Sequence, residues 1–323
     1  MNHASRLFEL LKTLVSKKLL VVSKNYSNIV SKKHFTAIKK KNASDLPVYA
    51  VDGGCSIIAD GGSWIYAKIK ISVIGYQGYK MIKKRIDNFY YGAVNTGRGR
   101  RDVLFEKNKQ VDLNVKSMHK NGDIDEMPAK VMKLLEWNAC LELLKKSDSG
   151  MVLMDSGFNP DNKDEEKIIG MVKSLSLKKN IPVIGFCKTT RMATNTGRSF
   201  IGVLSKMSSG LKKPWFYYPV FENEKNYSTG IVKMNFLGKY SYKINFWGNN
   251  VLSALNELTF YCNDKELLGY PYPLLKADKL GRVSDFETKS EFRRFKIQNA
   301  GNELLEDLKS QSFHSELDRR RYK

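Results

Sequence analysis

The stretch MVLMDSGFNPDNKDEEKIIGMVKSLSLKKNIPVIGFCK, residues 151–188, decides the fold class of this chain. It opens with an apolar run that stops at Asp155, passes through a segment of helical character near 164–179, and returns to an apolar run at 182–187 that stops at Lys188. Short apolar runs of this kind are typical of buried strands. Strand, helix and strand in this order predict parallel strands joined by a crossover helix.

The same alternation of apolar runs and helical segments extends toward the N-terminus. Residues 48–51 are apolar and are followed by Asp-Gly-Gly at 52–54, which predicts a buried strand that ends in a functional turn. Residues 128–146 predict a long helix, and Pro128 suits its first turn because the missing N–H would have no partner there. The predicted fold is therefore α/β, with a mixed sheet flanked by helices.

The outer parts of the chain carry further elements. Alternating residues over 64–74 predict a half-buried strand, residues 76–122 indicate more strands and loops, and aromatic-rich stretches predict strands at 215–221, 231–236 and 240–247. Helices are expected near 249–262, after Tyr270, over 4–40 and from 285 onward. We therefore predict an N-terminal helical arm (1–45), one catalytic domain (46–290) and a charged C-terminal helical tail (291–323).

The chain carries a large positive charge. Its 323 residues include 55 Lys and Arg against 33 Asp and Glu, a formal net charge of +22. Such a surplus concentrates polyanions near the surface, so nucleic acid is the first partner to consider. Charge alone leaves open the alternative that lysines simply fill solvated faces.

Several classes of protein and of site are disfavoured. The sequence has no run of 18 apolar residues, so no membrane span is expected, and its N-terminus lacks the pattern of a signal peptide. We therefore expect a cytoplasmic protein. The four cysteines form no C-x-x-C pair and the four histidines have no metal-binding spacing. Any metal would therefore be held by carboxylate oxygens.

Acidic residues stand at positions where a lone charge is costly. Asp52 and Asp155 each follow an apolar run, Glu136 lies in the apolar helix before the second run, and Asp278 lies on a late helix. Singly, an Asp at a strand end is more often a turn or helix cap than a ligand, and Glu136 could be a solvated helix position. Their order on strand, helix, strand and helix indicates one site. Two divalent ions held there could activate a water and stabilise the leaving oxygen at a phosphodiester.

At these positions the chain resembles the NurA nuclease family. The resemblance covers about residues 46–290 in the family's order. The chain departs from the family at Gly54, where many members have serine, and at Asp278, where many have histidine. The motifs that carry the resemblance are Val51-Asp52-Gly53-Gly54, Leu135-Glu136 before Val152–Gly157, Pro182–Thr189, and Gly269–Leu274 followed by Ala277-Asp278 and Arg282–Ser284.

The resemblance implies an RNase H-like fold and a manganese-dependent nuclease that acts at DNA ends as a 5′–3′ exonuclease and single-strand endonuclease. It also implies a homodimer that works with a HerA-type hexameric ATPase in DNA repair. By matching positions, Asp52, Glu136, Asp155 and Asp278 would hold Mn²⁺ or Mg²⁺, as two ions per site. Lys188 would contact the scissile phosphate or the attacking water; the alternative is a surface lysine among many.

Two sets of residues are candidates for contacting DNA away from the acids. Arg98, Arg100 and Arg101 lie in a glycine-punctuated basic segment, and guanidinium groups fit phosphate oxygens well. The alternative is an exposed basic hairpin without a ligand. Tyr217 and Tyr218 could stack on unpaired bases, although aromatic residues at alternating positions also suit a core or a dimer interface.

Two rival functions use the same fold. A non-catalytic DNA-binding adaptor for a translocase would use the basic surface without a metal, and an RNase H-like nuclease acting on RNA or branched nucleic acid would differ in substrate. A nucleotide kinase or actin-like ATPase is disfavoured because the sequence has no G-x-x-x-x-G-K-[ST] motif. Every nuclease interpretation requires acids that are distant in sequence to converge in one pocket.

Overall fold

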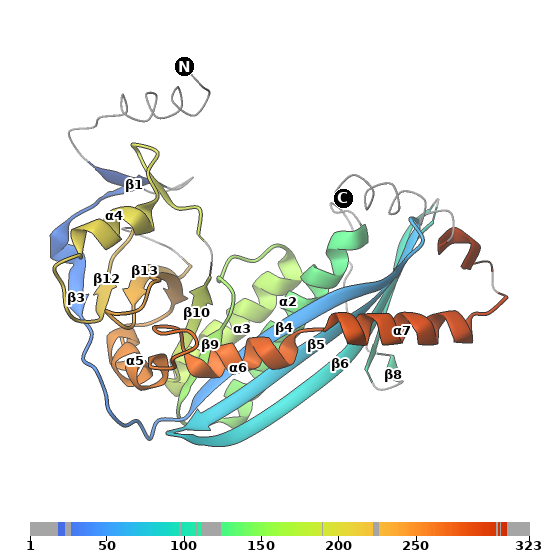
Figure 1. The fold of residues 1–323 in the computed structure, drawn as a ribbon, viewed down its shortest axis with the longest axis horizontal. Coiled ribbons are helices and arrows are strands. Elements are labelled where there is room, and N and C mark those ends of the chain that lie inside the picture. Colours follow the sequence, from blue (N-terminus) through green and yellow to red (C-terminus); the bar gives the residue numbers. More distant parts are fainter. Residues whose placement is uncertain are drawn as a thin grey trace.

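A large mixed sheet forms the centre of the computed structural model of this chain (Figure 1). The structure describes residues 19–22, 27–96, 98–106, 109–110, 124–188, 190–221, 226–301, 303 and 305–308. The sheet has eleven strands in the order β3-β12-β13-β14-β10-β9-β4-β5-β6-β7-β8. Their bounds are β3 Phe35–Ala37, β4 Val48–Asp60, β5 Trp64–Gln77, β6 Lys80–Thr96, β7 Gly99–Glu106, β8 Lys109–Gln110, β9 Met151–Met154, β10 Val183–Cys187, β12 Trp215–Tyr217, β13 Ser228–Lys233 and β14 Tyr242–Phe246.

The centre of the sheet is parallel and its flanks are antiparallel. β4 and β9 run parallel, with Val51 opposite Met154, and β9 and β10 run parallel, with Met154 opposite Gly185. Helix α2 (Met127–Lys146) leads into β9, and α3 (Lys163–Lys179) connects β9 to β10. The predicted α/β class, the helices and the parallel pairing of these strands are confirmed.

Each face of the sheet is covered by its own helices. On one face, side chains of β5 such as Ile69 pack in a buried cluster with α2 and α3. On the other face, Val48 and Ala50 of β4 pack with α5 (Val251–Leu258) and α6 (Tyr272–Gly281). Within the part of the chain that the structure describes, no helix is both long and apolar enough to cross a bilayer. The predicted apolar face of β5 is confirmed, since each of its members is at most 2% exposed: Ile65, Ala67, Ile69, Ile71 and Val73.

Strand β4 is longer than predicted. We expected a turn at residues 52–54, but all three residues continue the strand and pair with β5. The two glycines instead permit close approach. A Cβ at Gly54 would lie 2.6 Å from the carbonyl oxygen of Gly281 at the end of α6, and a Cβ at Gly53 would lie 2.8 Å from Oε1 of Glu136. The absence of side chains lets α6 and Glu136 reach the strand from its two sides.

The described part of the N-terminal segment is built mainly from strands, so the predicted helix is wrong there. β1 (Leu20–Val22) pairs with β2 (Ser27–Ile29) and with β11 (Ala193–Thr194) in a small second sheet, and β3 forms the edge of the large one. One short 3-10 helix, Lys32–His34, separates β2 from β3. Tertiary pairing outweighs the helical spacing of the apolar residues. Residues 4–18 of the predicted helix lie outside the described residues.

The predicted C-terminal helix is confirmed in α7 (Asp285–Gln298), which begins with a capping box made by Ser284 and Glu287. It lies along the sheet on the same side as α6 (Figure 1). The hydroxyl of Tyr90 on β6 donates to Oε1 of Glu291 at 2.9 Å. The predicted boundary at residue 290 falls inside this helix, and the division into domain and tail stays a prediction. Residues 309–323 lie outside the described residues.

The remaining helical segments connect or cover these elements. They are η3 (Ile124–Glu126) before α2, α4 (Phe200–Met207) over the small sheet, and η4 (Thr259–Cys262) directly after α5.

Candidate metal centre

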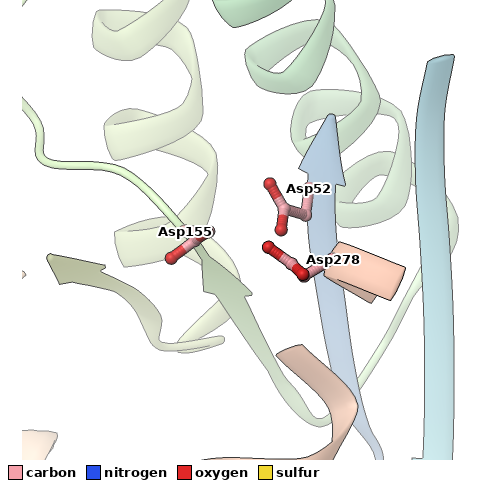
Figure 2. A group of neighbouring side chains, drawn as sticks. All are labelled: Asp52, Asp155 and Asp278. Carbon is pink, nitrogen blue, oxygen red and sulfur yellow. The ribbon is translucent and has the colours of Figure 1, made fainter. Parts of the chain in front are cut away.

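Three aspartates from three different elements meet beside the central strands, as Figure 2 shows. Asp52 comes from β4, Asp155 follows β9 directly, and Asp278 lies on α6. One oxygen from each side chain lies within 4.8 Å of the other two. The structure therefore brings together three of the four acids that the sequence singled out.

Strand pairing explains why Asp52 and Asp155 are neighbours. Val51 and Met154 are partners in the parallel ladder, so the next residue of each strand reaches the same level of the sheet. β9 stops at Met154 while β4 continues, which leaves Asp155 at the carboxyl end of a parallel strand. Ligand sites of open α/β sheets are commonly found at that end of the strands.

The hydroxyl of Ser72 holds α6 against β4. Ser72 is the cross-strand partner of Asp52 and is fully buried. Its hydroxyl donates to the carbonyl oxygen of Ala277 at 2.7 Å and lies 3.2 Å from the carbonyl oxygen of Asp52. Because Ala277 directly precedes Asp278, this contact sets the position of Asp278. The sequence predicted a half-buried strand over residues 64–74, so Ser72 was not singled out; that prediction is wrong here, because α6 covers the second face of β5.

Glu136, the fourth acid, approaches from the other side of β4. It lies on α2, is 5% exposed, and its Oε1 lies against the backbone of Gly53. It lines the same hollow as the three aspartates but is not one of the three whose oxygens lie within 4.8 Å of one another. Asp52 therefore stands between Glu136 on one side and Asp278 on the other.

An ammonium group sits among the three aspartates. Nζ of Lys188 lies 2.7 Å from Oδ1 of Asp278, is in still shorter contact with Asp155, and is 3.9 Å from Oδ2 of Asp52. The hydroxyl of Tyr270 donates to Oδ1 of Asp155 at 3.1 Å. Lys188 thus occupies the focus of the negative charge, where a divalent cation would be most strongly attracted.

Burial and mutual repulsion hold protons on this cluster. Burial, together with the charges of Asp155 and Glu136, raises the pKa of Asp52 to about 9, against the opposing charge of Lys188. Burial and Asp155 raise the pKa of Glu136 to about 8. Burial also raises the pKa of Asp155, although Lys188 and Tyr270 act in the opposite direction. A cluster of this kind needs added positive charge in order to be fully ionised at neutral pH.

The donor set fits a hard divalent cation. It consists of carboxylate oxygens, the ligands that Mg²⁺ and Mn²⁺ prefer. Oδ2 of Asp52 is buried and accepts no hydrogen bond from any residue that the structure describes, and Nζ of Lys188 at 3.9 Å is too far away to donate one. A buried carboxylate oxygen that accepts no hydrogen bond is available to a metal ion.

Comparison with known proteins shows which fold carries this arrangement. No protein-family model matches the chain, and no curated protein matches its sequence. In three dimensions it matches the NurA nuclease from Sulfolobus solfataricus with a TM-score of 0.53 and 15% identity, over 91% of this chain and 92% of that one. The fold is that of NurA. Two further matches are human ENDOV and the catalytic domain of human Endonuclease V, each with a TM-score of 0.37, at 10% and 11% identity, over 81% and 86% of this chain and 94% of each of those chains.

In this NurA fold, the predicted arginine segment lies far from the candidate metal centre. Arg101 on β7 pairs with Val94 on β6, and Val94 pairs with Trp64 at the start of β5. Trp64 lies eight residues along β5 from Ser72, the cross-strand partner of Asp52. At roughly 3.3 Å per residue, this distance along the sheet is about 26 Å. Arg98 and Arg101 are exposed there, and their contact with DNA stays a prediction. The side chain of Arg100 is only 6% exposed and its Nε lies 3.2 Å from Asp102, so the prediction that it grips phosphate is wrong for this structure.

The two predicted stacking residues differ in exposure. Tyr217 is 1% exposed, its ring lies against Phe35 and Phe200, and its hydroxyl accepts a hydrogen bond from the backbone of Ser31. It is a core residue and offers no face to a base, so the prediction for Tyr217 is wrong. Tyr218 is 40% exposed. Successive residues along an extended chain point to opposite faces of the sheet, so the side chains of Tyr217 and Tyr218 lie on different sides.

Sequence reasoning also left Tyr270 without a role. Tyr270 is part of the Gly269–Leu274 motif, but only the structure brings its hydroxyl to Asp155. The ring is 1% exposed, and Lys188 Nζ lies 5.9 Å from its centre. The sequence feature that could have identified Tyr270 is the Tyr-Pro-Tyr-Pro stretch just before the helix that carries Asp278.

Proposed function

We propose that this chain is a metal-dependent nuclease that hydrolyses phosphodiester bonds at DNA ends. The observation that carries the proposal is the convergence of Asp52, Asp155 and Asp278 within 4.8 Å inside a chain of formal charge +22. A buried negative focus in a strongly positive molecule suits a centre that holds divalent cations while the surrounding surface attracts a polyanion.

Each acid has a distinct position relative to the cations. Asp52, Asp155 and Asp278 would hold divalent cations, and Glu136 would contribute from the other side of β4. When bound, such ions activate water for attack on phosphate and stabilise the leaving oxygen. Tyr270 keeps Asp155 oriented through its hydroxyl. Burial of Asp52 and Glu136 limits the water that would otherwise compete for their oxygens.

Lys188 has two tasks in this proposal. Without metal, its ammonium neutralises Asp155 and Asp278. Its side chain is 41% exposed, so it can turn toward solvent when cations replace it and contact a phosphate oxygen of the substrate. This keeps Lys188 in the catalytic role expected from the sequence.

A cleavage assay tests the metal centre. Purified chain is incubated with Mn²⁺, Mg²⁺ or EDTA and with end-labelled single-stranded DNA, duplex DNA, branched DNA and RNA. Asp52→Asn is compared with Asp148→Asn, because Asp148 is a fully exposed aspartate between α2 and β9. We expect Mn²⁺-dependent cleavage of DNA by the unmodified chain and by Asp148→Asn, and its loss in Asp52→Asn.

The same assay separates the rival functions. Salt-sensitive DNA binding that survives Asp52→Asn, without cleavage in any metal, would establish the adaptor function instead. Preferential cleavage of RNA or of branched DNA would assign the other substrate class. Equal cleavage by Asp52→Asn and the unmodified chain would eliminate this site.

The partners are proposed from the motif resemblance. We propose a homodimer that acts in the cytoplasm with a HerA-type hexameric ATPase in DNA repair. Sedimentation of the purified chain tests the dimer, and co-purification with a HerA-type ATPase of the same organism tests the complex. A monomer at micromolar concentration, or an ATPase that elutes separately, would remove the corresponding part of the proposal.

A further inference from the structure

A second hollow, of about 680 Å³, lies between the β5–β6 turn and η4. Pockets that hold small planar ligands commonly measure roughly 300 to 1,000 Å³, so this one has room for a nucleotide. It is separate from the metal centre, because none of the four acids lines it. Its lining is aromatic and basic, and includes Tyr76, Tyr79, Phe260, Tyr272, Lys40 and Lys41.

The aromatic rings at this hollow are arranged in two edge-to-face pairs. Tyr79 and Phe260 have ring centres 4.9 Å apart, and Tyr76 and Tyr272 have ring centres 5.3 Å apart. Tyr79 stands in the β5–β6 turn next to Gly78, whose φ is +55°, and is 90% exposed. Its ring is therefore open to a planar ligand, and aromatic faces of this kind stack on nucleobases regardless of sequence.

The charge of the rim favours a phosphate. Lys39, Lys40 and Lys41 form a basic run, and all three are exposed. Lys41 is paired with Glu257 at 3.1 Å. The acid of the lining, Asp264, is engaged by its own turn, since Oδ1 accepts a hydrogen bond from the backbone of Glu266 at 2.9 Å. Lys40 is thus the lining cation best placed to meet a phosphate.

The hollow lies within reach of a strand bound at the metal centre. Tyr272 and Asp278 are six residues apart on α6, which is about 9 Å along the helix. Tyr76 and Ser72, the partner of Asp52, are four residues apart on β5, which is about 13 Å. At roughly 3.4 Å per stacked nucleotide, these two separations, measured to Tyr272 and Tyr76 at the near side of the hollow, correspond to about three to four nucleotides.

We propose that this hollow binds an unpaired nucleotide of the strand whose phosphodiester lies at the metal centre. Tyr79 stacks on the base, and Lys40 contacts the phosphate. The proposal rests on the proposed nuclease function and specifies its substrate: a single strand, or a duplex whose end has been opened by about three to four base pairs. A blunt, closed duplex presents no free base to Tyr79.

Binding in EDTA tests this subsite without cleavage. The full chain is titrated into a fluorescein-labelled dT oligonucleotide of about 20 residues and into a blunt duplex of equal length. We expect Tyr79→Ala to weaken binding of the single strand by about 5- to 100-fold and to leave duplex binding unchanged. Tyr79→Phe should restore it, because stacking needs the ring and not the hydroxyl. Tyr240→Ala, which removes a half-exposed tyrosine that does not line the hollow, is the control.

A fluorescent base locates the contact. An oligonucleotide with 2-aminopurine at successive positions should show quenching at one position, about three to four nucleotides from the cleaved bond, and that quenching should be lost in Tyr79→Ala. Lys40→Ala should reduce the salt dependence of single-strand binding. Together these results would place base and phosphate at the hollow.

The outcomes separate this proposal from the metal centre. Equal single-strand affinity for Tyr79→Ala and the unmodified chain would overturn the subsite, even if Asp52→Asn abolishes cleavage. Unchanged affinity with altered sedimentation of Tyr79→Ala would also overturn it and assign the hollow to a protein contact. Cleavage retained by Asp52→Asn would remove the metal centre while leaving the base contact measurable.

Discussion

Nζ of Lys188 lies 2.7 Å from Oδ1 of Asp278, although the two residues come from opposite flanks of the candidate metal centre, one after β10 and the other on α6. The same ammonium contacts Asp155. These ion pairs raise the pKa of Lys188 above its ordinary value, despite the opposing effect of burial. One cation thereby compensates a cluster of acids that repel one another, and in the proposed function it would give way to divalent ions.

Replacing this lysine tests that compensation. Lys188→Met leaves the acids without their ammonium, so we expect the melting temperature in EDTA to fall by roughly 2 to 6 °C. Mn²⁺ should restore most of the loss, and DNA cleavage should fall at least tenfold because no side chain contacts the phosphate. Lys279→Met, which removes an exposed lysine of α6 paired with Glu266, is the control. Equal melting of the two variants in EDTA would contradict the role given to Lys188.

The raised carboxyl pKa values predict how stability depends on pH. The pKa of Asp52 rises from 3.8 to about 9 and that of Glu136 from 4.5 to about 8, so the folded chain binds protons that the unfolded chain has released. This stabilisation is complete below the unfolded values and is lost as pH rises through the folded values. The metal-free chain should therefore become less stable from pH 6 to pH 9.

Metal binding should reverse this trend, because the cation binds the ionised carboxylates. Thermal melting at each pH with EDTA or Mn²⁺ measures both effects. Asp52→Asn should flatten the metal-free curve and reduce the Mn²⁺ effect, whereas Asp148→Asn should leave both unchanged. A metal-free stability that rises over this range would show that the acids are already ionised in the fold.

The close approach of α6 to β4 makes Gly54 sensitive to any side chain. A Cβ there would lie 2.6 Å from the carbonyl oxygen of Gly281, so Gly54→Ala must push α6 and Asp278 outward. We expect lower thermal stability and at least tenfold slower cleavage. Gly170→Ala is the matched control, because a Cβ on this helical glycine would meet nothing within 4 Å and should stabilise the chain by about 0.5 to 1 kcal/mol. Wild-type cleavage by Gly54→Ala would disprove the packing argument.

Tyr270 is expected to act through Asp155 as a positioning residue. Tyr270→Phe removes the hydroxyl that donates to Asp155 but keeps the buried ring, so Mn²⁺ affinity measured by calorimetry should fall about tenfold with little change in melting. Tyr242→Phe provides the comparison, since that buried hydroxyl has no hydrogen-bond partner among the described residues. If both variants bind Mn²⁺ equally, the hydroxyl does not orient Asp155.

Much of the central fold follows from local patterns. The apolar runs before Asp155 and Lys188, with a helix between them, predicted parallel strands, and the alternation over residues 64–74 predicted which face of β5 is buried. Local patterns were misleading where distant segments supply the partner. Residues 20–22 have apolar side chains that suit a helix, but they pair with residues 193–194. Gly53 and Gly54 suggested a turn, but they make room for Glu136 and Gly281.

The sequence by itself determined the chemical nature of the candidate site: carboxylates placed after apolar strands and within an apolar helix, where an unpaired charge is unstable. Only the tertiary structure decided which of them meet. The ladder between β4 and β9 aligns Asp52 with Asp155, and the hydroxyl of Ser72 anchors α6 beside them. The ammonium group of Lys188 contacts Asp155. Burial and charge balance depend on neighbours that are remote along the chain, and for that reason residue order cannot specify them.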